Sequence, residues 1–196
     1  MNNVIRMICL AGLAVMVGAG QVWGGIILQD EGSSYSQILA AQAAGQTFTA
    51  EDAGISSIGF DLAVMNSGHP NAPISVSLYT GVGNGGSLLH TATGTLEPGY
   101  EGFFDFDFTM VTLVPGNVYS AMVGTTSARW AVAYSQHSFP SGAPISSRTD
   151  YVGGDAILYG NVRTIDDLNF RVIPEPATLS LLALGGLAVL CRRRKL

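Results

Sequence analysis

The stretch Ile74-Ser-Val-Ser-Leu-Tyr-Thr80 alternates apolar and polar side chains without interruption. Successive side chains of an extended chain point to opposite faces, so Ile74, Val76 and Leu78 share one face and the residues between them share the other. This alternation predicts a half-buried β-strand. The following run, Gly81-Val-Gly-Asn-Gly-Gly86, is rich in glycines that adopt positive φ at low cost, so it predicts a hairpin connection to a next strand.

The same alternation recurs along the middle of the chain, in short runs separated by Gly, Asn, Pro and Ser. Only the segment from Ser36 to Ala44 has a pattern that could be mistaken for a helix. The runs predict strands over residues 46–49, 55–63, 74–80, 88–95, 102–109, 118–124, 130–134, 156–159 and 168–172. Because no helices alternate with these strands, we expect an all-β fold, an antiparallel β-sandwich that is jelly-roll-like.

The beginning of the chain has the pattern of a secretory signal peptide. Arg6 precedes an apolar run from Met7 to Gly20, and small residues follow it. A basic start, a short apolar helix and small residues at the exit are typical of such peptides. We expect cleavage after Ala19 or after Gly24.

The charges are divided between the ends and the middle of the chain. The net charge is −5, yet five of the nine basic residues lie at the ends, Arg6 and the cluster from Arg192 to Lys195. The middle is therefore acidic and has no basic patch, which argues against nucleic acid as a partner. Cys9 and Cys191 also lie in the end segments, so we expect the middle to be stable without a disulfide.

The last 23 residues combine three features in a fixed order. Pro174-Glu175-Pro176 comes first, and because proline disfavours helix and strand pairing we expect an exposed, extended linker there. The apolar run from Ala177 to Cys191 follows, about 15 residues or roughly 22 Å of helix, against a bilayer core of about 30 Å. Snorkelling basic side chains can compensate for such a difference, so we expect a single transmembrane helix. The basic residues that hold the cytoplasmic side are Arg192, Arg193, Arg194 and Lys195.

This order of motif, apolar segment and basic tail closely resembles the PEP-CTERM protein-sorting signal. The resemblance implies that a membrane exosortase recognises Pro174, Glu175 and Pro176 and cleaves near them. It also implies transient anchoring in the inner membrane, followed by release to the cell envelope or extracellular matrix of a Gram-negative-type bacterium that makes exopolysaccharide. The alternative is an ordinary tail anchor. The chain thus divides into a signal peptide (1–24), a β-sandwich domain (25–173) and a sorting segment (174–196).

The middle of the chain has a resemblance of its own. The runs GQTFTA, ISVSLYTGVGNGGSLL and VTLVPGNVYSAMV are similar to an exported β-sandwich module of bacterial surface proteins. Modules of this kind often accompany sugar-active enzymes or adhesins. The resemblance implies the fold, and it extends to a sugar-binding function only by analogy.

Catalytic and metal-binding patterns are weak. There is no G-x-S-x-G nucleophile motif, and His69, His90 and His137 stand alone, so we expect no enzyme activity. Asp105 and Asp107 are two residues apart on one strand face and could share a Ca²⁺ ion, the one cofactor that we consider. The alternative is that these aspartates form an exposed polar face opposite a row of phenylalanines. Asp166-Asp167 is a second acidic pair, placed in a loop before a strand.

Sugar binding usually requires exposed aromatic rings, because the apolar faces of sugars stack on them. One of the candidate rings, Trp130, we expect to pack in the core instead. The candidates are Trp130, Tyr134, Phe139, Tyr151 and Phe103. The sequence therefore predicts a structural or adhesive protein within exopolysaccharide, with a carbohydrate-binding module, calcium-assisted in one version, as the alternative.

Overall fold

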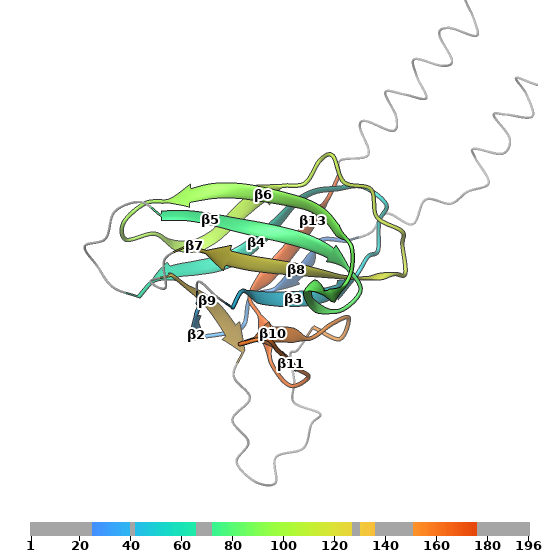
Figure 1. Cartoon of the computed structure of the whole chain (residues 1–196). Helices are drawn as coiled ribbons and strands as arrows, with labels where there is room; N and C mark the ends of the chain where they lie inside the picture. The colour runs from blue at the N-terminus through green and yellow to red at the C-terminus, as the bar shows by residue number, and fades with distance from the viewer. Residues whose placement is uncertain (1–24, 40–41, 66–71, 127–129, 136–150, 176–196) are drawn as a thin grey trace, which may run out of the picture. The chain divides into compact units, whose positions relative to one another are not determined.

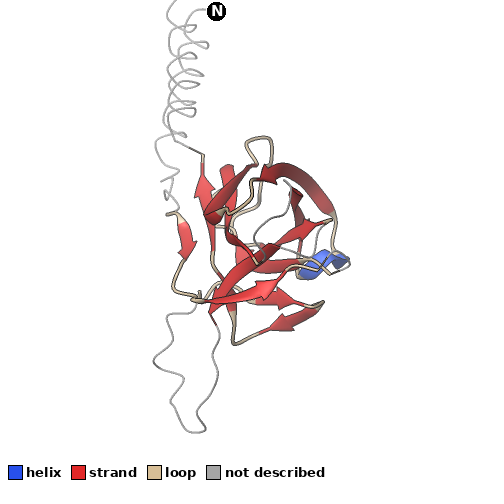
Figure 2. Cartoon of the chain, turned by 90° about the vertical axis from the view of Figure 1, so that its left-hand side faces the viewer, coloured by secondary structure: helices blue, strands red, loops and turns tan. Residues whose placement is uncertain are grey.

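The computed structural model describes residues 25–39, 42–65, 72–126, 130–135 and 151–175, which form two antiparallel β-sheets packed face to face (Figures 1 and 2). The compact unit that they build spans Gly25–Pro174. The predicted signal peptide and residues 176–196 of the sorting segment lie outside the described residues. Within the described part of the chain, no helix combines the length and the apolar character needed to cross a membrane.

The first sheet has six strands in the order β11-β10-β3-β8-β5-β6. A short 3-10 turn, η1 (Gly83–Gly85), lies in the predicted hairpin connection between β5 and β6. The strands are β3 (Ala44–Thr49), β5 (Ala72–Thr80), β6 (Leu88–Leu96), β8 (Val118–Thr125), β10 (Ala156–Leu158) and β11 (Asn161–Arg163).

The second sheet has seven strands, with the main order β1-β13-β4-β9-β12, while β2 pairs with β9 and β7 pairs with β4. The strands are β1 (Ile27–Gln29), β2 (Ser34–Gln37), β4 (Ile55–Val64), β7 (Glu101–Asp107), β9 (Trp130–Ser135), β12 (Asp167–Leu168) and β13 (Phe170–Pro174). The predicted all-β antiparallel class is thus confirmed, whereas the jelly-roll description of the strand order stays a prediction.

The core lies between the two sheets and follows the predicted alternation. Ile74, Val76 and Leu78 of β5 are almost completely buried, and the side chains between them are partly exposed. The second sheet contributes phenylalanines from β4, β7 and β13. The largest buried rings are Phe48, Phe60, Phe106, Phe108 and Phe170. Apolar burial of this kind is the main favourable contribution to folding.

A buried polar bridge crosses this apolar core. Gln46 of β3 in the first sheet donates from Nε2 to Oδ1 of Asp167 in the second sheet, over 2.7 Å. The Gln46 Oε1 accepts from the backbone N–H of Leu168 over 2.8 Å, and the N–H of Tyr151 donates to the other Asp167 oxygen. Both Gln46 and Asp167 are buried. The prediction that Asp167 belongs to an acidic pair in a loop is therefore wrong, because its carboxylate accepts hydrogen bonds that join the sheets.

Asn169 separates β12 from β13 at the point where the chain enters between β9 and β4. Its N–H donates to the carbonyl of Ala133, and its carbonyl accepts from Asp61. Its side chain holds the backbone of Gly32 by two hydrogen bonds, of 2.8 and 2.9 Å. A Cβ on residue 32 would lie 2.5 Å from the Asn169 side-chain oxygen, so this close approach requires glycine. The predicted strand over 168–172 is thus interrupted by a buried asparagine.

Three short strands of the described residues, β1, β2 and β11, were not predicted from the sequence. β1 and β2 lie near the start of the domain, and β2 ends inside the helix-like segment, at Gln37. The described residues of that segment contain no helix. β11 returns from β10 through Tyr159 and Gly160, both with positive φ. Positive φ at both central residues is the geometry of a tight hairpin turn. The Tyr159 hydroxyl lies 3.1 Å from the Ser36 hydroxyl of the other sheet.

Removing the Asn169 side chain tests the importance of this junction. We expect Asn169→Ala to lower the free energy of unfolding by about 2 kcal/mol, because the partly buried backbone N–H and carbonyl of Gly32 lose their hydrogen-bond partner. Urea denaturation followed by tryptophan fluorescence measures the effect. Asn161→Ala is the matched control, since Asn161 is exposed on β11, and it should change stability by no more than about 0.5 kcal/mol. Equal effects of the two variants would contradict this account.

Candidate functional site

The sorting motif begins inside the folded domain. Pro174, its first residue, is the last residue of β13 and pairs with Ile55 of β4. The prediction that Pro174 belongs to an exposed linker is wrong. Proline is tolerated at this position because it ends the strand, where its missing N–H interrupts no further pairing.

A β-bulge turns one hydroxyl toward this strand end. Ile173 pairs with Ser57 and Pro174 pairs with Ile55, so Ser56 is left over in the register. Bulges of this kind redirect a side chain. The Ser56 hydroxyl lies within hydrogen-bond distance of two carbonyls, that of Ile173 at 3.1 Å and that of Pro174 at 3.3 Å. We call these two contacts the Ser56 clasp.

The start and the end of the domain lie at one end of the sandwich. β1 pairs antiparallel with β13, with Ile27 opposite Val172. Gly25 and Pro174 consequently line the same small pocket, together with apolar side chains of the core. The sorting segment therefore leaves the domain beside the point where the chain enters it.

The two candidate calcium ligands face different partners. Asp105 accepts from Nε of Arg171 over 2.8 Å and also contacts Nη2 of the same side chain. This hydrogen bonding raises the pKa of Arg171 above its ordinary value. The guanidinium carbon also lies 4.7 Å from the centre of the Phe103 ring. The Asp105–Arg171 ion pair passes over Gly59 of β4. A Cβ at residue 59 would lie 2.3 Å from the Asp105 carboxylate, so the pair needs a glycine there.

Asp107 is exposed and binds the turn that follows it. Its Oδ1 accepts from the backbone N–H of Thr109 over 2.9 Å and from the Thr109 hydroxyl over 2.8 Å. These bonds hold the pKa of Asp107 below its ordinary value, so the carboxylate is ionised at neutral pH. Among the described residues, no group of three or more His, Cys, Asp or Glu side chains is arranged to hold a metal ion. Calcium binding stays a prediction that would require Asp105 to exchange its arginine partner.

The aromatic candidates are mostly committed to packing. Trp130 is buried in the core, as expected for a structural role. Tyr151 packs edge-on against Phe170 at 5.2 Å between ring centres, and burial raises its pKa. Tyr134 is half-buried against the core. His90 stands edge-on against Phe108. Phe139, His69 and His137 lie outside the described residues.

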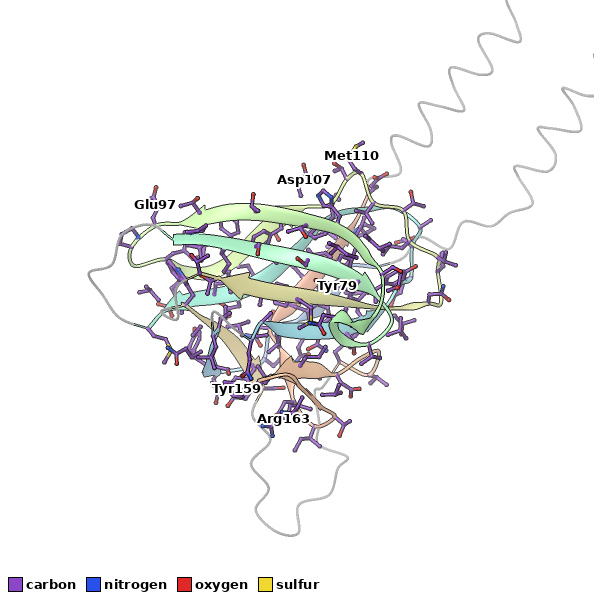
Figure 3. The ribbon with its side chains drawn as sticks, in the orientation of Figure 1. Tyr79, Glu97, Asp107, Met110, Tyr159 and Arg163 are labelled. Atoms are coloured by element: carbon purple, nitrogen blue, oxygen red, sulfur yellow. The ribbon has the colours of Figure 1, made fainter. Side chains whose placement is uncertain are left out.

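A different surface presents groups suited to polar ligands. The outward positions of β5 and β6 form a patch that we call the hydroxyl face, and Ser77 and Thr91 hydrogen-bond across the two strands at 2.8 Å. Figure 3 shows Tyr79 on this side of the six-stranded sheet. The residues of the hydroxyl face are Ser75, Ser77, Tyr79, Thr91 and Thr93. The signal for this face was present in the sequence, in the polar positions of the strand over residues 74–80.

The hydroxyl face is uncharged although the chain is acidic. In the described strands β3, β5, β6 and β8, no position opposite to the core-facing residues carries Asp, Glu, His, Lys or Arg. Charged side chains lie instead on the outer side of the seven-stranded sheet, at Asp61, Glu101, Asp105 and Arg171. Beside β6 lies a shallow hollow of about 250 Å³ lined by His90, Ala92, Thr93, Asp107, Thr109 and Met110. The two outer faces therefore differ in the ligands that they can attract.

A family model for the PEP-CTERM protein-sorting motif matches residues 172–195. This chain carries a PEP-CTERM sorting motif. The match begins two residues before Pro174, within β13, so the PEP-CTERM segment and the β-sandwich overlap in sequence. The expected sorting residues Pro174, Glu175, Pro176 and the basic tail all lie within the matched range.

Comparison with other proteins adds little beyond this motif. No curated protein is recognisably similar to this chain. Among solved structures, the clostridial cysteine protease Cwp84 after propeptide cleavage is similar at 12% sequence identity and a TM-score of 0.47. The similar region covers 76% of this chain and 39% of that one. A likeness at this level carries no argument about activity.

Proposed function

We propose that this chain is an exported protein that a membrane exosortase processes on its way to the cell envelope or extracellular matrix. The PEP-CTERM motif at residues 172–195 is the observation that carries the proposal. In this proposal the signal peptide starts export, and the apolar run from Ala177 to Cys191 holds the chain in the inner membrane. Pro174, Glu175 and Pro176 are read by the exosortase, so Glu175 is a recognition residue of a substrate.

The basic tail sets the orientation of the anchored chain. Lys and Arg residues next to a membrane segment stay on the cytoplasmic side. Arg192 to Lys195 therefore leave the β-sandwich on the outside, which is also where a signal peptide sends it. Both ends of the chain support the same direction of export.

Within the matrix, we propose a structural or adhesive role for a jelly-roll-like domain that contacts exopolysaccharide and is not an enzyme. The uncharged hydroxyl face supports this role, because serine, threonine and tyrosine hydroxyls both donate and accept hydrogen bonds, as sugar hydroxyls do. Tyr79 adds a ring on which a sugar can stack. The alternative is a carbohydrate-binding module in which calcium, held by Asp105 and Asp107, assists binding.

Changing the central acid of the motif tests the sorting proposal. We expect Glu175→Ala to leave the chain unprocessed and in the membrane fraction, because the exosortase loses the charged group that it recognises. Cell fractionation and immunoblotting of the native host measure this. Glu97→Ala is the matched control, since Glu97 is exposed in the turn after β6, and it should be processed normally. Normal processing and delivery of the Glu175→Ala variant would show that the motif is not read as proposed.

The polysaccharide proposal is tested with the host's own exopolysaccharide in a pull-down of the mature protein. We expect Tyr79→Ala to weaken binding by about tenfold, equivalent to about 1.4 kcal/mol. Tyr35→Ala, at an exposed tyrosine of the other sheet, should bind as the unchanged protein does.

The same pull-down distinguishes the calcium-assisted version. Binding that EDTA abolishes, and that Asp107→Asn abolishes as well, supports a calcium-assisted module. Binding unchanged by EDTA removes calcium from the proposal. If the unchanged protein retains no polysaccharide with or without calcium, both the adhesive role and the binding module are wrong.

A further inference from the structure

The sorting motif and the last strand share Pro174, and this overlap constrains where processing can occur. We propose that the β-sandwich sets the end of the mature chain: the peptide bond that is cut lies after Glu175, at Glu175–Pro176 or beyond it. This inference rests on the proposed function, since it assumes that an exosortase processes the chain. It adds the boundary that the folded domain imposes on that enzyme.

The residues before this boundary are held on two sides. Val172 is buried and pairs with both Ile27 of β1 and Ile58 of β4. Ile173 pairs with Ser57, and Pro174 pairs with Ile55. Up to Val172 the strand is therefore paired on both sides, with β1 and with β4. Ile173 and Pro174 are paired with β4 alone.

The Ser56 clasp competes for the carbonyls that a protease would need, with the single hydroxyl proton shared between the two of them. Peptide-bond cleavage requires the carbonyl of the cut residue to enter the enzyme's oxyanion-stabilising site. The carbonyls of Ile173 and Pro174 both lie within hydrogen-bond distance of the Ser56 hydroxyl. Cutting the Ile173–Pro174 or Pro174–Glu175 bond would require the clasp and the strand pairing to open first. Glu175 is the first residue after the clasp.

The covalent step involves no group of this domain. The C–N bond after the last retained residue breaks, and the carbonyl carbon forms a new bond to the oxygen of water or to the nitrogen of an acceptor amine. The departing nitrogen takes up a proton and leaves as the amine of the released tail. With water as acceptor, the mature protein ends in a carboxylate, and with an amine it ends in an amide of the same residue.

The contribution of the clasp can be separated from that of the strand. Ser56→Ala removes the hydroxyl and leaves the backbone pairing of β4. Ser57→Ala is the matched control, because Ser57 is the next residue of the same strand, is also partly buried, and makes no side-chain hydrogen bond among the described residues. A difference between the two variants therefore reports on the clasp.

The experiment identifies the last residue of the mature protein recovered from the native host, by mass spectrometry of its C-terminal peptide. We expect the unchanged chain and Ser57→Ala to retain both Pro174 and Glu175. We expect Ser56→Ala to yield additional chains ending at Ile173 or Pro174. A mature unchanged chain that ends at Pro174 or earlier would overturn the proposal, whatever the behaviour of the variants.

A second arm decides the matter if no processing occurs. A chain that stays full-length in the host contradicts the proposed function, and the clasp is then tested on the purified full chain in detergent with a non-specific protease. We expect the protected domain to keep Glu175 in the unchanged chain and in Ser57→Ala, and to end earlier in Ser56→Ala. Identical boundaries in all three chains, or loss of Pro174 from the unchanged chain, would show that the clasp protects nothing.

Discussion

The buried hydrogen bonds between Gln46 and the segment Asp167–Leu168 are the constraint on which the rest of the domain depends. A buried carboxylate is costly unless it is hydrogen-bonded, and here its oxygens accept from Gln46 and from the backbone of Tyr151. These bonds join the two sheets at one fixed register, which apolar packing alone specifies less sharply. Because β13 begins only one residue later, after Asn169, its register against β4 is fixed as well, and with it the position of the sorting motif.

Much of the sandwich could be predicted from the sequence, because half-buried strands must alternate apolar and polar residues. The strand over residues 74–80 and its hairpin are the clearest case. The missed strands, such as β1 and β11, are three residues long and too short for alternation to be visible. Asp167 was misplaced for a different reason: an acid beside a second acid looks exposed, and its buried partner Gln46 is 121 residues away.

The functional residues also divide into those that the sequence predicts and those that it does not. The sorting motif could be read from the sequence because an enzyme must recognise it as a linear segment, with a fixed order of motif, apolar run and basic tail. That Pro174 is paired in a strand could not be read, because proline usually ends pairing and the hydroxyl that holds it belongs to distant Ser56. The hydroxyl face likewise depends on which strands become neighbours. A short sequence pattern is therefore enough to find the sorting motif, whereas the hydroxyl face can be found only once the neighbouring strands are known.

The central claim is that the sheet-to-sheet bridge fixes the last strand, so that the folded domain ends at Pro174 within the sorting motif. Amide hydrogen exchange of the unchanged chain and of Gln46→Ala, followed residue by residue, tests it most directly. The account predicts slow exchange from Leu168 to Ile173 in the unchanged chain, fast exchange at Glu175, and loss of protection throughout this strand in the variant. Fast exchange of the Val172 and Ile173 amides in the unchanged chain, or full protection in Gln46→Ala, would contradict it.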